Sequence, residues 1–240
     1  MLNPSAAPPV LHEVGGFDMR IAAEPWWFAE RHAEEIAAHW RAAAAKNPTL
    51  FNGRVLIARE LSVEAGIVRA TYVEIDYAVL LYWRSLGFPS LSGAANCFGA
   101  GVVVTADGAV LLAEMGRHTA NAGRIFFPAG TPDRDDIRGD RLDIESSILR
   151  ELGEETGLTN GIVRPSGQRW AIVDGALAAC ARRLDTDLDA EALGERIRGF
   201  LAREKQPELD GIVLARSMAD VDPVRVPAYA QALLKVLLPG

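Results

Sequence analysis

Cysteines and long apolar runs are scarce in this sequence, and both shortages restrict what the protein can be. The 240 residues include only 2 cysteines, Cys97 and Cys180, which lie far apart and lack the close spacing of metal ligands. We therefore expect reduced, packed thiols in a cytoplasmic protein rather than a disulfide framework. Apolar runs such as Ala78–Trp83 are far shorter than the ~18 residues that cross a bilayer. The opening segment MLNPSAAPPVLHEVGG lacks the basic start and apolar core of a signal peptide, so we expect no membrane partner.

Positive charge is also in short supply. Lys and Arg total 25 against 32 Asp and Glu, which gives a formal net charge of −7. Binding to a nucleic-acid backbone requires clustered cations, so this balance argues against nucleic acid as a partner. The apolar share of 49% and the charged share of 24% are typical of a globular protein. An anionic small molecule would therefore have to be held by a local feature rather than by the overall charge.

The first part of the chain predicts a small α/β region. Residues 1–15, rich in Pro and Ala, predict a flexible arm. Pro25 opens a helix that closes before Pro48, and a second helix is predicted over 77–86. Strands are predicted at 17–22, 55–61 and 67–74, the last two joined by a turn at Ala65-Gly66. The stretch LSGAAN that follows is the best boundary candidate, so we predict an N-terminal region over 1–92 and a second domain over 93–240.

Beyond this boundary the pattern of hydrophobic residues changes. Two apolar strands flank Asp107-Gly108, a strong hairpin signal, and 143–156 predicts a helix that Gly157 ends. Further strands are predicted at 124–128, 169–184 and 208–217, and further helices at 189–205 and 228–238. Strands and helices mixed in this order predict an α+β fold in which a sheet is layered with helices.

The segment DIESSILRELGEETGL, residues 143–158, is the most informative element. On a helix, Ile144, Ile148, Glu151 and Glu155 share one stripe, so two carboxylates continue a line that begins with two apolar residues. Glu154 lies three residues from Glu151, which brings a third carboxylate to the same side. Carboxylates held together repel unless a cation or shared protons offset the charge, and oxygen donors suit Mg²⁺ or Mn²⁺. The alternative interpretation is a solvated acidic face on which Arg150 pairs with Glu154.

The run Arg150-Glu-Leu-Gly-Glu-Glu-Thr-Gly-Leu158 resembles the second half of the Nudix box, R-E-apolar-x-E-E-x-G-apolar, at every specified position. Five fixed residues recur by chance on the order of 10⁻⁴ times in a chain of this length. The resemblance extends from roughly Asn96 to the C-terminus. It implies a Nudix-type α/β/α sandwich, to which residues 1–92 would add a further α/β region.

The first half of the box departs from the family pattern. Asp136 stands at the place of the opening Gly, and Leu142 at the place of a Glu that supports the helix and its Arg. The segment FFPAG, which ends at Gly130, is similar to the family's approach to that opening Gly and indicates a loop with six extra residues. The missing Glu leaves three substitutes open as partners of Arg150: Asp140, Asp143 and Glu145.

The resemblance implies catalytic and metal-binding roles for the residues of the box. The catalytic residues would be Glu151, Glu154 and Arg150, which orients the carboxylates. The ligands of Mg²⁺, or of Mn²⁺ as the second candidate ion, would be three carboxylates and one backbone carbonyl: Glu151, Glu154, Glu155 and Ala129.

Residues outside this set would complete the site. Gly130 and Gly157 would serve backbone geometry, because glycine reaches left-handed conformations without strain. Glu208 and Asp210 are the candidate downstream acids that could take a proton, with solvated loop residues as the alternative. Three arginines flank the site as candidate phosphate ligands: Arg117, Arg124 and Arg134.

These residues predict Mg²⁺-dependent hydrolysis of a pyrophosphate bond in a nucleoside diphosphate linked to another moiety. The FFPAGTP loop, the longer box and the LFNG segment resemble the branch of UDP-glucose and UDP-galactose pyrophosphatases, which implies a UDP-sugar such as UDP-glucose as substrate. The alternative is a nucleotide-binding or sensing Nudix module with little or no turnover, which the missing Glu at Leu142 favours. Residues 1–92 could cap the site, select the substrate or form a homodimer contact.

Overall fold

Two mixed sheets organise the computed structural model, which describes residues 7–48, 50–89, 91 and 93–239. The larger sheet has the order β1-β11-β12-β5-β6-β13, with β7 beside β6 and β8 beside β5. Its β5 and β12 run parallel, while its other pairs are antiparallel. Its strands are β1 (Val10–Glu13), β5 (Asn96–Val104), β6 (Val110–Met115), β7 (Ile125–Phe126), β8 (Ala129–Gly130), β11 (Val163–Asp174), β12 (Leu177–Thr186) and β13 (Leu209–Ala215).

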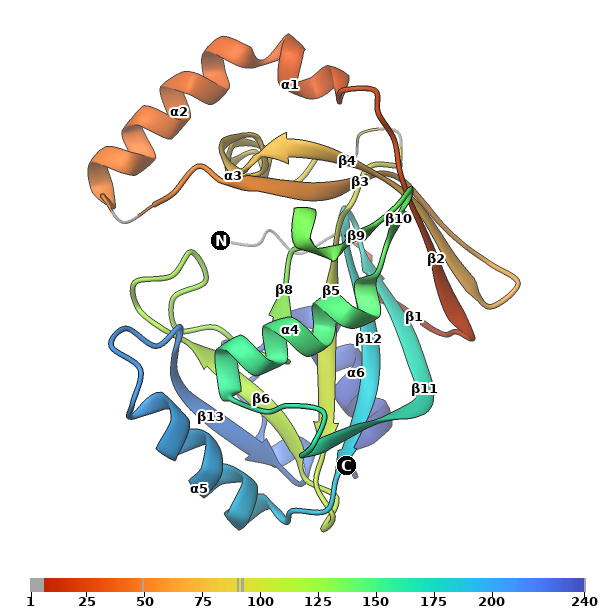
Figure 1. Cartoon of the computed structure of the whole chain (residues 1–240), viewed down its shortest axis with the longest axis vertical. Helices are drawn as coiled ribbons and strands as arrows, with labels where there is room; N and C mark the ends of the chain where they lie inside the picture. Colours follow the sequence, from red (N-terminus) through yellow and green to blue (C-terminus); the bar gives the residue numbers. More distant parts are fainter. Residues whose placement is uncertain (1–6, 49, 90, 92, 240) are drawn as a thin grey trace.

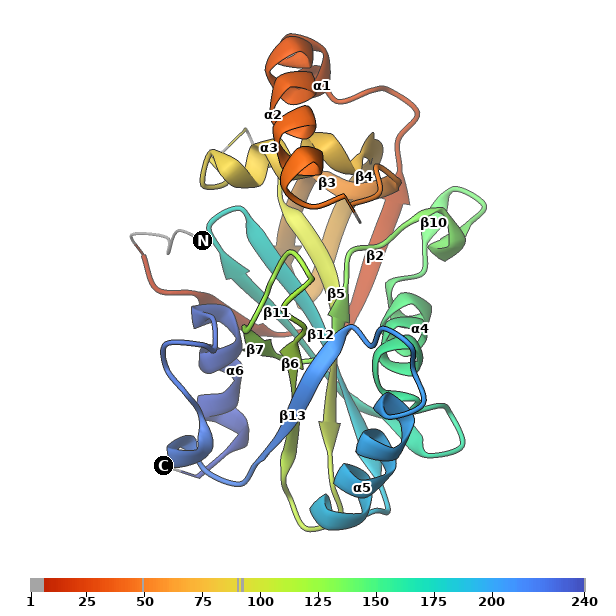
Figure 2. The same cartoon turned by 90° about the vertical axis from the view of Figure 1, so that its left-hand side faces the viewer.

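Helices cover both faces of this larger sheet (Figure 2). Side chains alternate between the two faces along a strand, and β5 follows this rule. Val103 packs in a cluster with α4 and α5, whereas Val102 and Val104 pack in the cluster that contains α6. The helices are α4 (Ile144–Thr156), α5 (Ala190–Leu201) and α6 (Ala228–Leu237). The helices and mixed sheets confirm the predicted α+β class.

The smaller sheet has the order β3-β4-β2-β10-β9 and lies between the larger sheet and a layer of helices (Figure 1). Leu56 of β3 faces the larger sheet in a cluster with Cys97 and Cys180, while its neighbour Ile57 faces α3. The strands are β2 (Gly16–Ile21), β3 (Arg54–Glu64), β4 (Ile67–Asp76), β9 (Ile137–Arg138) and β10 (Arg141–Leu142). The helices are α1 (Trp27–Arg31), α2 (Ala33–Lys46) and α3 (Tyr77–Ser85).

The two sheets exchange strands across the predicted boundary. β1, from the N-terminal region, pairs with β11 of the larger sheet. In return, β10 continues the smaller sheet through the pair Arg141 and Arg20. The division into 1–92 and 93–240 stays a prediction. One strand from before the boundary, β1, joins the larger sheet, and one from after it, β10, joins the smaller sheet.

Several local predictions need correction. Residues 10–13 of the predicted flexible arm form β1, because their backbone pairs with β11, and residues 1–6 lie outside the described residues. The strand predicted over 169–184 is a hairpin of two strands that turns at Gly175, where φ is 61°. The helix predicted from Pro25 is interrupted at His32, where φ is −112°.

The other elements lie close to their predicted positions, including the turn at Ala65-Gly66, where φ is 49° and 72°. Both cysteines are free and buried, with their Sγ atoms 3.6 Å apart. In the described ranges of the chain, no helix is both long and apolar enough to cross a membrane.

Candidate active site

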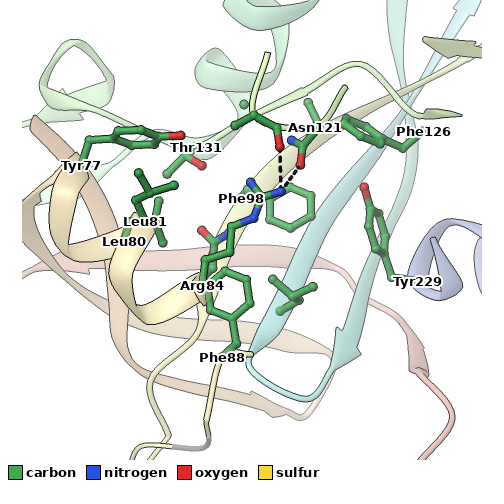
Figure 3. A pocket seen from close by; sticks show the side chains of 15 residues that line it. Tyr77, Leu80, Leu81, Arg84, Phe88, Phe98, Asn121, Phe126, Thr131 and Tyr229 are labelled. Carbon is green, nitrogen blue, oxygen red and sulfur yellow. Dashed lines mark hydrogen bonds between the residues drawn. The ribbon is translucent and has the colours of Figure 1, made fainter. Parts of the chain in front are cut away.

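Strand β8, Ala129–Gly130, contacts the walls of two cavities. One cavity, of about 200 Å³, lies beside the C-terminal half of α4 and is lined mainly by acidic residues. The other, of about 150 Å³, lies below α3 and is lined mainly by apolar and aromatic residues, with Ala129 and Gly130 in its wall (Figure 3). Four of the acids singled out by the sequence line the first cavity: Glu151, Glu154, Glu155 and Glu208.

Local signals at both ends of α4 set the direction of its side chains. The Asp143 carboxylate accepts hydrogen bonds from the Ser146 backbone N–H at 3.0 Å and from its hydroxyl at 2.7 Å, which caps the N-terminus. Gly157 ends the helix in the left-handed conformation, with φ of 71°. Between these ends, Ile148 and Leu152 are buried against the larger sheet, so the stripe that carries Glu151 and Glu155 faces inward.

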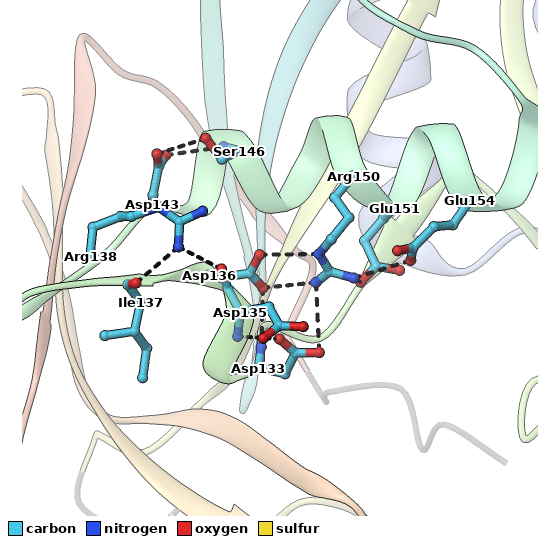
Figure 4. A network of polar contacts seen from close by, with 10 residues as sticks. All are labelled: Asp133, Asp135, Asp136, Ile137, Arg138, Asp143, Ser146, Arg150, Glu151 and Glu154. Atoms are coloured by element: carbon cyan, nitrogen blue, oxygen red, sulfur yellow. Dashed lines mark hydrogen bonds and ion pairs between the residues drawn. The ribbon is translucent and has the colours of Figure 1, made fainter.

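Arg150 is held by a carboxylate that the sequence analysis did not assign to it (Figure 4). Its guanidinium donates to both oxygens of Asp136, at 2.9 Å from Nη2 and 3.3 Å from Nε. The Asp136 side chain is only 3% exposed, and it also accepts a hydrogen bond from the Asp133 backbone N–H at 3.1 Å. Arg150 Nη1 lies 2.9 Å from Glu151 and 3.1 Å from Glu154. Arg150 therefore links a buried aspartate to two of the box glutamates.

None of the three substitutes considered for the missing Glu acts as the partner of Arg150. Asp143 caps α4, and Glu145 pairs instead with Arg169 and Arg182. Asp140 is exposed. Among the described residues, its backbone carbonyl accepts a hydrogen bond from the Ile21 N–H. Leu142 is buried in the apolar cluster between the sheets, so its side chain adds to the core. The signal that could have identified Asp136 is its position fourteen residues before Arg150, where the family pattern places the opening Gly.

Glu155 is a buried carboxyl group, and Glu151 is a half-buried one. Burial has the largest effect on Glu151 and raises its pKa to about 7. The charges of Glu154 and Glu208 also raise this pKa, whereas the charge of Arg150 lowers it. Burial also raises the pKa of Glu155 well above its ordinary value, with further contributions from Glu151 and Glu208. The Ala129 backbone N–H donates to the Glu155 carboxylate at 3.3 Å and opposes this shift. Two adjacent acids whose ionisation is disfavoured form a place where a cation would be stabilised.

The other acidic candidates differ in whether they line the acidic cavity. The Glu154 side chain is 60% exposed but lines the acidic cavity together with Glu208. Asp210 lies outside this cavity, and its carboxylate accepts the Arg117 backbone N–H at 3.2 Å. Glu204, three residues after the end of α5, also lines the cavity, and sequence reasoning did not identify it.

The donor set of this cavity fits a hard divalent cation. Five carboxylates line it, and carboxylate oxygens are the ligands that Mg²⁺ and Mn²⁺ prefer: Glu151, Glu154, Glu155, Glu204 and Glu208. Within the part of the chain that the structure describes, no three acidic, histidine or cysteine side chains already stand together as a metal group. The contact that the structure shows for the fourth predicted ligand, Ala129, is made by its N–H group.

Gly130 and Gly157 have different reasons to be glycine. Gly157 has a positive φ of 71°, as predicted for the box. Gly130 does not lie in the left-handed region, but a Cβ atom built there would come 2.0 Å from Glu151 Cδ. Its role is therefore to let the Glu151 carboxyl group approach β8, rather than to adopt an unusual backbone conformation.

Of the three arginines considered as phosphate ligands, Arg134 and Arg124 are engaged elsewhere and Arg117 is exposed. Arg134 pairs with Glu74 of β4. Arg124 donates to the Val224 carbonyl at 2.9 Å, and the Arg117 side chain is 95% exposed.

No protein-family model matches this sequence, and no curated protein matches it. Several solved Nudix structures are similar to it over about 60% of the chain. The MutT protein from Methanosarcina mazei Go1 has 17% identity, covers 60% of this chain and 92% of that chain, and gives a TM-score of 0.40. The NUDIX domain of NrtR from Shewanella oneidensis, complexed with ADP ribose, has 15% identity, 59% and 84% coverage and a TM-score of 0.38. A bifunctional NMN adenylyltransferase/ADP ribose pyrophosphatase from Francisella tularensis, complexed with AMP and a Mn ion, has 14% identity, 66% and 45% coverage and a TM-score of 0.39.

Proposed function

We propose that this chain hydrolyses a pyrophosphate bond in a nucleoside diphosphate linked to another moiety, with Mg²⁺ as its cofactor. The observation that carries the proposal is a pair of inward-facing carboxyl groups at one acidic cavity, Glu155, which is buried, and Glu151, whose side chain is 17% exposed. An ordinary surface helix exposes its acids, because ionised carboxylates are strongly destabilised by burial. A cation bound between the two carboxylates would explain why both face inward.

Three carboxylates and one carbonyl would hold the ion: Glu151, Glu154, Glu155 and Ala129. A bound Mg²⁺, or Mn²⁺ in its place, supplies charge neutralisation at phosphate oxygens and lowers the pKa of a bound water. The chain's own contribution is positional. Arg150, fixed by Asp136, restrains the carboxylates of Glu151 and Glu154.

Proton removal from the attacking water is assigned to Glu151 or to Glu208. A general base works best when its pKa lies near the working pH, and burial raises the pKa of Glu151 to about 7 in the metal-free protein. Glu208 lines the same cavity, whereas Asp210 does not. Of the two downstream acids, Glu208 is therefore the one we propose.

A UDP-sugar such as UDP-glucose is the first substrate to test, because the FFPAGTP loop and the lengthened box resemble that branch of the family. ADP-ribose is the second, because the NrtR domain was solved with it. A homodimer is also proposed, with residues 60–64 of the edge strand β3 as the contact, because the backbone at Leu56 and Ala58 already bonds to Pro132 and Ala95. Light scattering of the purified protein tests the homodimer.

The second candidate function is a nucleotide sensor that binds without turnover. Leu142 in place of the box Glu favours it. The bond between Arg150 and Asp136 favours the hydrolase, because it supplies the support that the missing Glu would give.

A phosphate-release assay with UDP-glucose, ADP-ribose, dinucleotides and oxidised nucleotides, with and without Mg²⁺, tests the proposal. We expect Mg²⁺-dependent turnover of at least one substrate and a loss of about 100-fold or more in Glu155→Gln, as when one preorganised charge is removed from an active site. Glu195→Gln, an exposed glutamate on α5, is the matched control and should retain full activity. Unchanged turnover in Glu155→Gln would overturn the metal site, and binding of a nucleotide without product would favour the sensor.

A further inference from the structure

The cavity below α3 has the walls of a site for a planar ligand. Its 150 Å³ are bounded by aromatic rings from both parts of the chain, with Tyr77 and Phe88 from the α3 segment and Phe98, Phe126 and Tyr229 from the larger sheet and α6 (Figure 3). Aromatic side chains of this kind stack on nucleobases and similar rings.

Arg84, on the last turn of α3, brings a positive charge into this apolar cavity. Its Nη2 donates to the Ala120 carbonyl and to Asn121 Oδ1, both at 2.9 Å, and both acceptors are neutral. Among the ion pairs of the described residues, none joins Arg84 to a carboxylate, whereas Arg54, Arg134 and Arg150 each have one. Burial lowers the pKa of Arg84, and the nearby charge of Arg124 acts in the same direction. A partly buried guanidinium without a counter-charge is a binding site for an anion.

Asn96 also lines this cavity and carries an acceptor without a partner. Its Oδ1 atom is buried and has no hydrogen-bond partner in the described part of the chain. A buried polar atom without a partner costs free energy, and a ligand N–H group would remove that cost. Uracil, adenine and related bases carry such N–H groups on their edges.

The position of the cavity connects it to the acidic site. Ala129 and Gly130 lie in its wall, and the same two residues contact Glu155 and Glu151. One extended ligand could therefore lie with its ring below α3 and its diphosphate across β8.

We propose that the cavity below α3 binds the nucleoside monophosphate end of the substrate, with Arg84 binding its phosphate and Asn96 accepting a hydrogen bond from its base. The link to the acidic cavity rests on the proposed function, but binding itself does not. The proposal gives the N-terminal region a task, because α3 supplies Arg84 and Tyr77 and thereby selects the ligand.

Calorimetric titration of the full chain in the presence of a chelator tests this site without metal or turnover. The probes are AMP, UMP, adenosine, uridine and inorganic phosphate. We expect at least one monophosphate to bind, and Arg84→Met to weaken it about tenfold or more, as is typical of a lost charge-assisted hydrogen bond. The parent nucleoside should bind more weakly and respond little to Arg84→Met. Asn96→Leu should weaken the nucleotide and the nucleoside alike.

Arg196→Met is the matched control, because Arg196 is an exposed arginine on α5 outside this cavity, and it should bind like the wild type. Arg84→Lys keeps the charge and should recover part of the affinity, and thermal melts verify that each variant is folded. Equal affinity in Arg84→Met, absence of monophosphate binding, or phosphate binding as tightly as AMP would overturn the proposal.

The two proposals can fail separately. Turnover with an unchanged KM in Arg84→Met would remove the ligand site and leave the hydrolase. Monophosphate binding that depends on Arg84, in a protein that turns over no substrate, would keep the ligand site and remove the hydrolase.

Discussion

At the scale of single residues, the acidic site depends on two positions outside the box helix. Asp136 forms two hydrogen bonds with Arg150, and Arg150 in turn lies beside Glu151 and Glu154. Gly130 leaves the space that the Glu151 carboxyl group occupies against β8. A substitution at Asp136 or Gly130 should therefore shift the glutamate carboxylates of α4, although the glutamates themselves are unchanged.

Replacing Asp136 by Asn should uncouple Arg150 from its support. We expect a loss of about 1–3 kcal/mol in the free energy of unfolding, because a buried charge pair is broken while Arg150 keeps partial access to solvent. Activity should fall at least tenfold. Asp140→Asn, an exposed change in the same loop, should leave both quantities unchanged. Chemical denaturation and steady-state kinetics of the two variants provide the comparison, and equal behaviour would contradict the role of Asp136.

The pKa of Glu155 predicts how the stability of the metal-free protein depends on pH. Burial raises this pKa in the folded state above the ordinary value of 4.5, so the folded protein binds the proton more tightly than the unfolded chain does. Stability therefore falls as the pH rises from about 4.5 through the folded pKa. Glu155→Gln removes this loss, so its free energy of unfolding should rise relative to the wild type between pH 5 and pH 8 in a chelating buffer. Parallel pH profiles for the two proteins would refute the assignment.

At the scale of elements, α4 lies directly on the backbone of β5. A Cβ atom at Gly99 would come 2.6 Å from Ile148 Cγ1, whereas one at Gly101 would meet its nearest neighbours at an ordinary 3.5 Å. The glycine at 99 thus sets how closely the helix with Arg150 and the box glutamates approaches the sheet.

Gly99→Ala should consequently destabilise the protein by about 1–3 kcal/mol, the usual effect of overpacking a filled core. Activity should fall as well, because α4 is displaced. Gly101→Ala, two residues along the same strand, is the matched control and should change stability by less than about 1 kcal/mol. Urea denaturation of both variants distinguishes them, and equal loss in the two would show that the effect comes from the strand rather than from α4.

At the scale of the whole molecule, the acidic cavity and the cavity below α3 depend on both sheets being in place. β1 joins the N-terminal region to the larger sheet, and β10 joins the box loop to the smaller one. The turn that carries Asp136 leads directly into β9 and β10, so the support of Arg150 is tied to the packing between the sheets.

Mg²⁺ should stabilise the whole folded molecule, since its ligands come together only there. At a free concentration about 100 times the dissociation constant, the expected gain is about 2.7 kcal/mol. Differential scanning fluorimetry should show a rise in Tm with Mg²⁺ for the wild type and a much smaller rise for Glu155→Gln. Na⁺ at equal ionic strength is the control, and an identical response to both salts would count against the metal site.

Local signals in the sequence were sufficient for much of the fold and for the core of the candidate site. The Asp107-Gly108 hairpin, the helix ending at Gly157 and the inward stripe of Glu151 and Glu155 follow from interactions between residues close in the chain. Such turns, caps and helical periods are determined by neighbouring residues, so they can be predicted without the rest of the molecule.

The sequence by itself therefore determined most of the elements, the α+β class and the face on which the acids lie. The tertiary structure decided the partners: Asp136 for Arg150, Glu208 rather than Asp210 at the acidic cavity, and the neutral acceptors on Ala120 and Asn121 for Arg84. The strand exchange through β1 and β10 was decided in the same way. These contacts join residues far apart in the chain, and they depend on how sheets and helices pack, which no local pattern specifies.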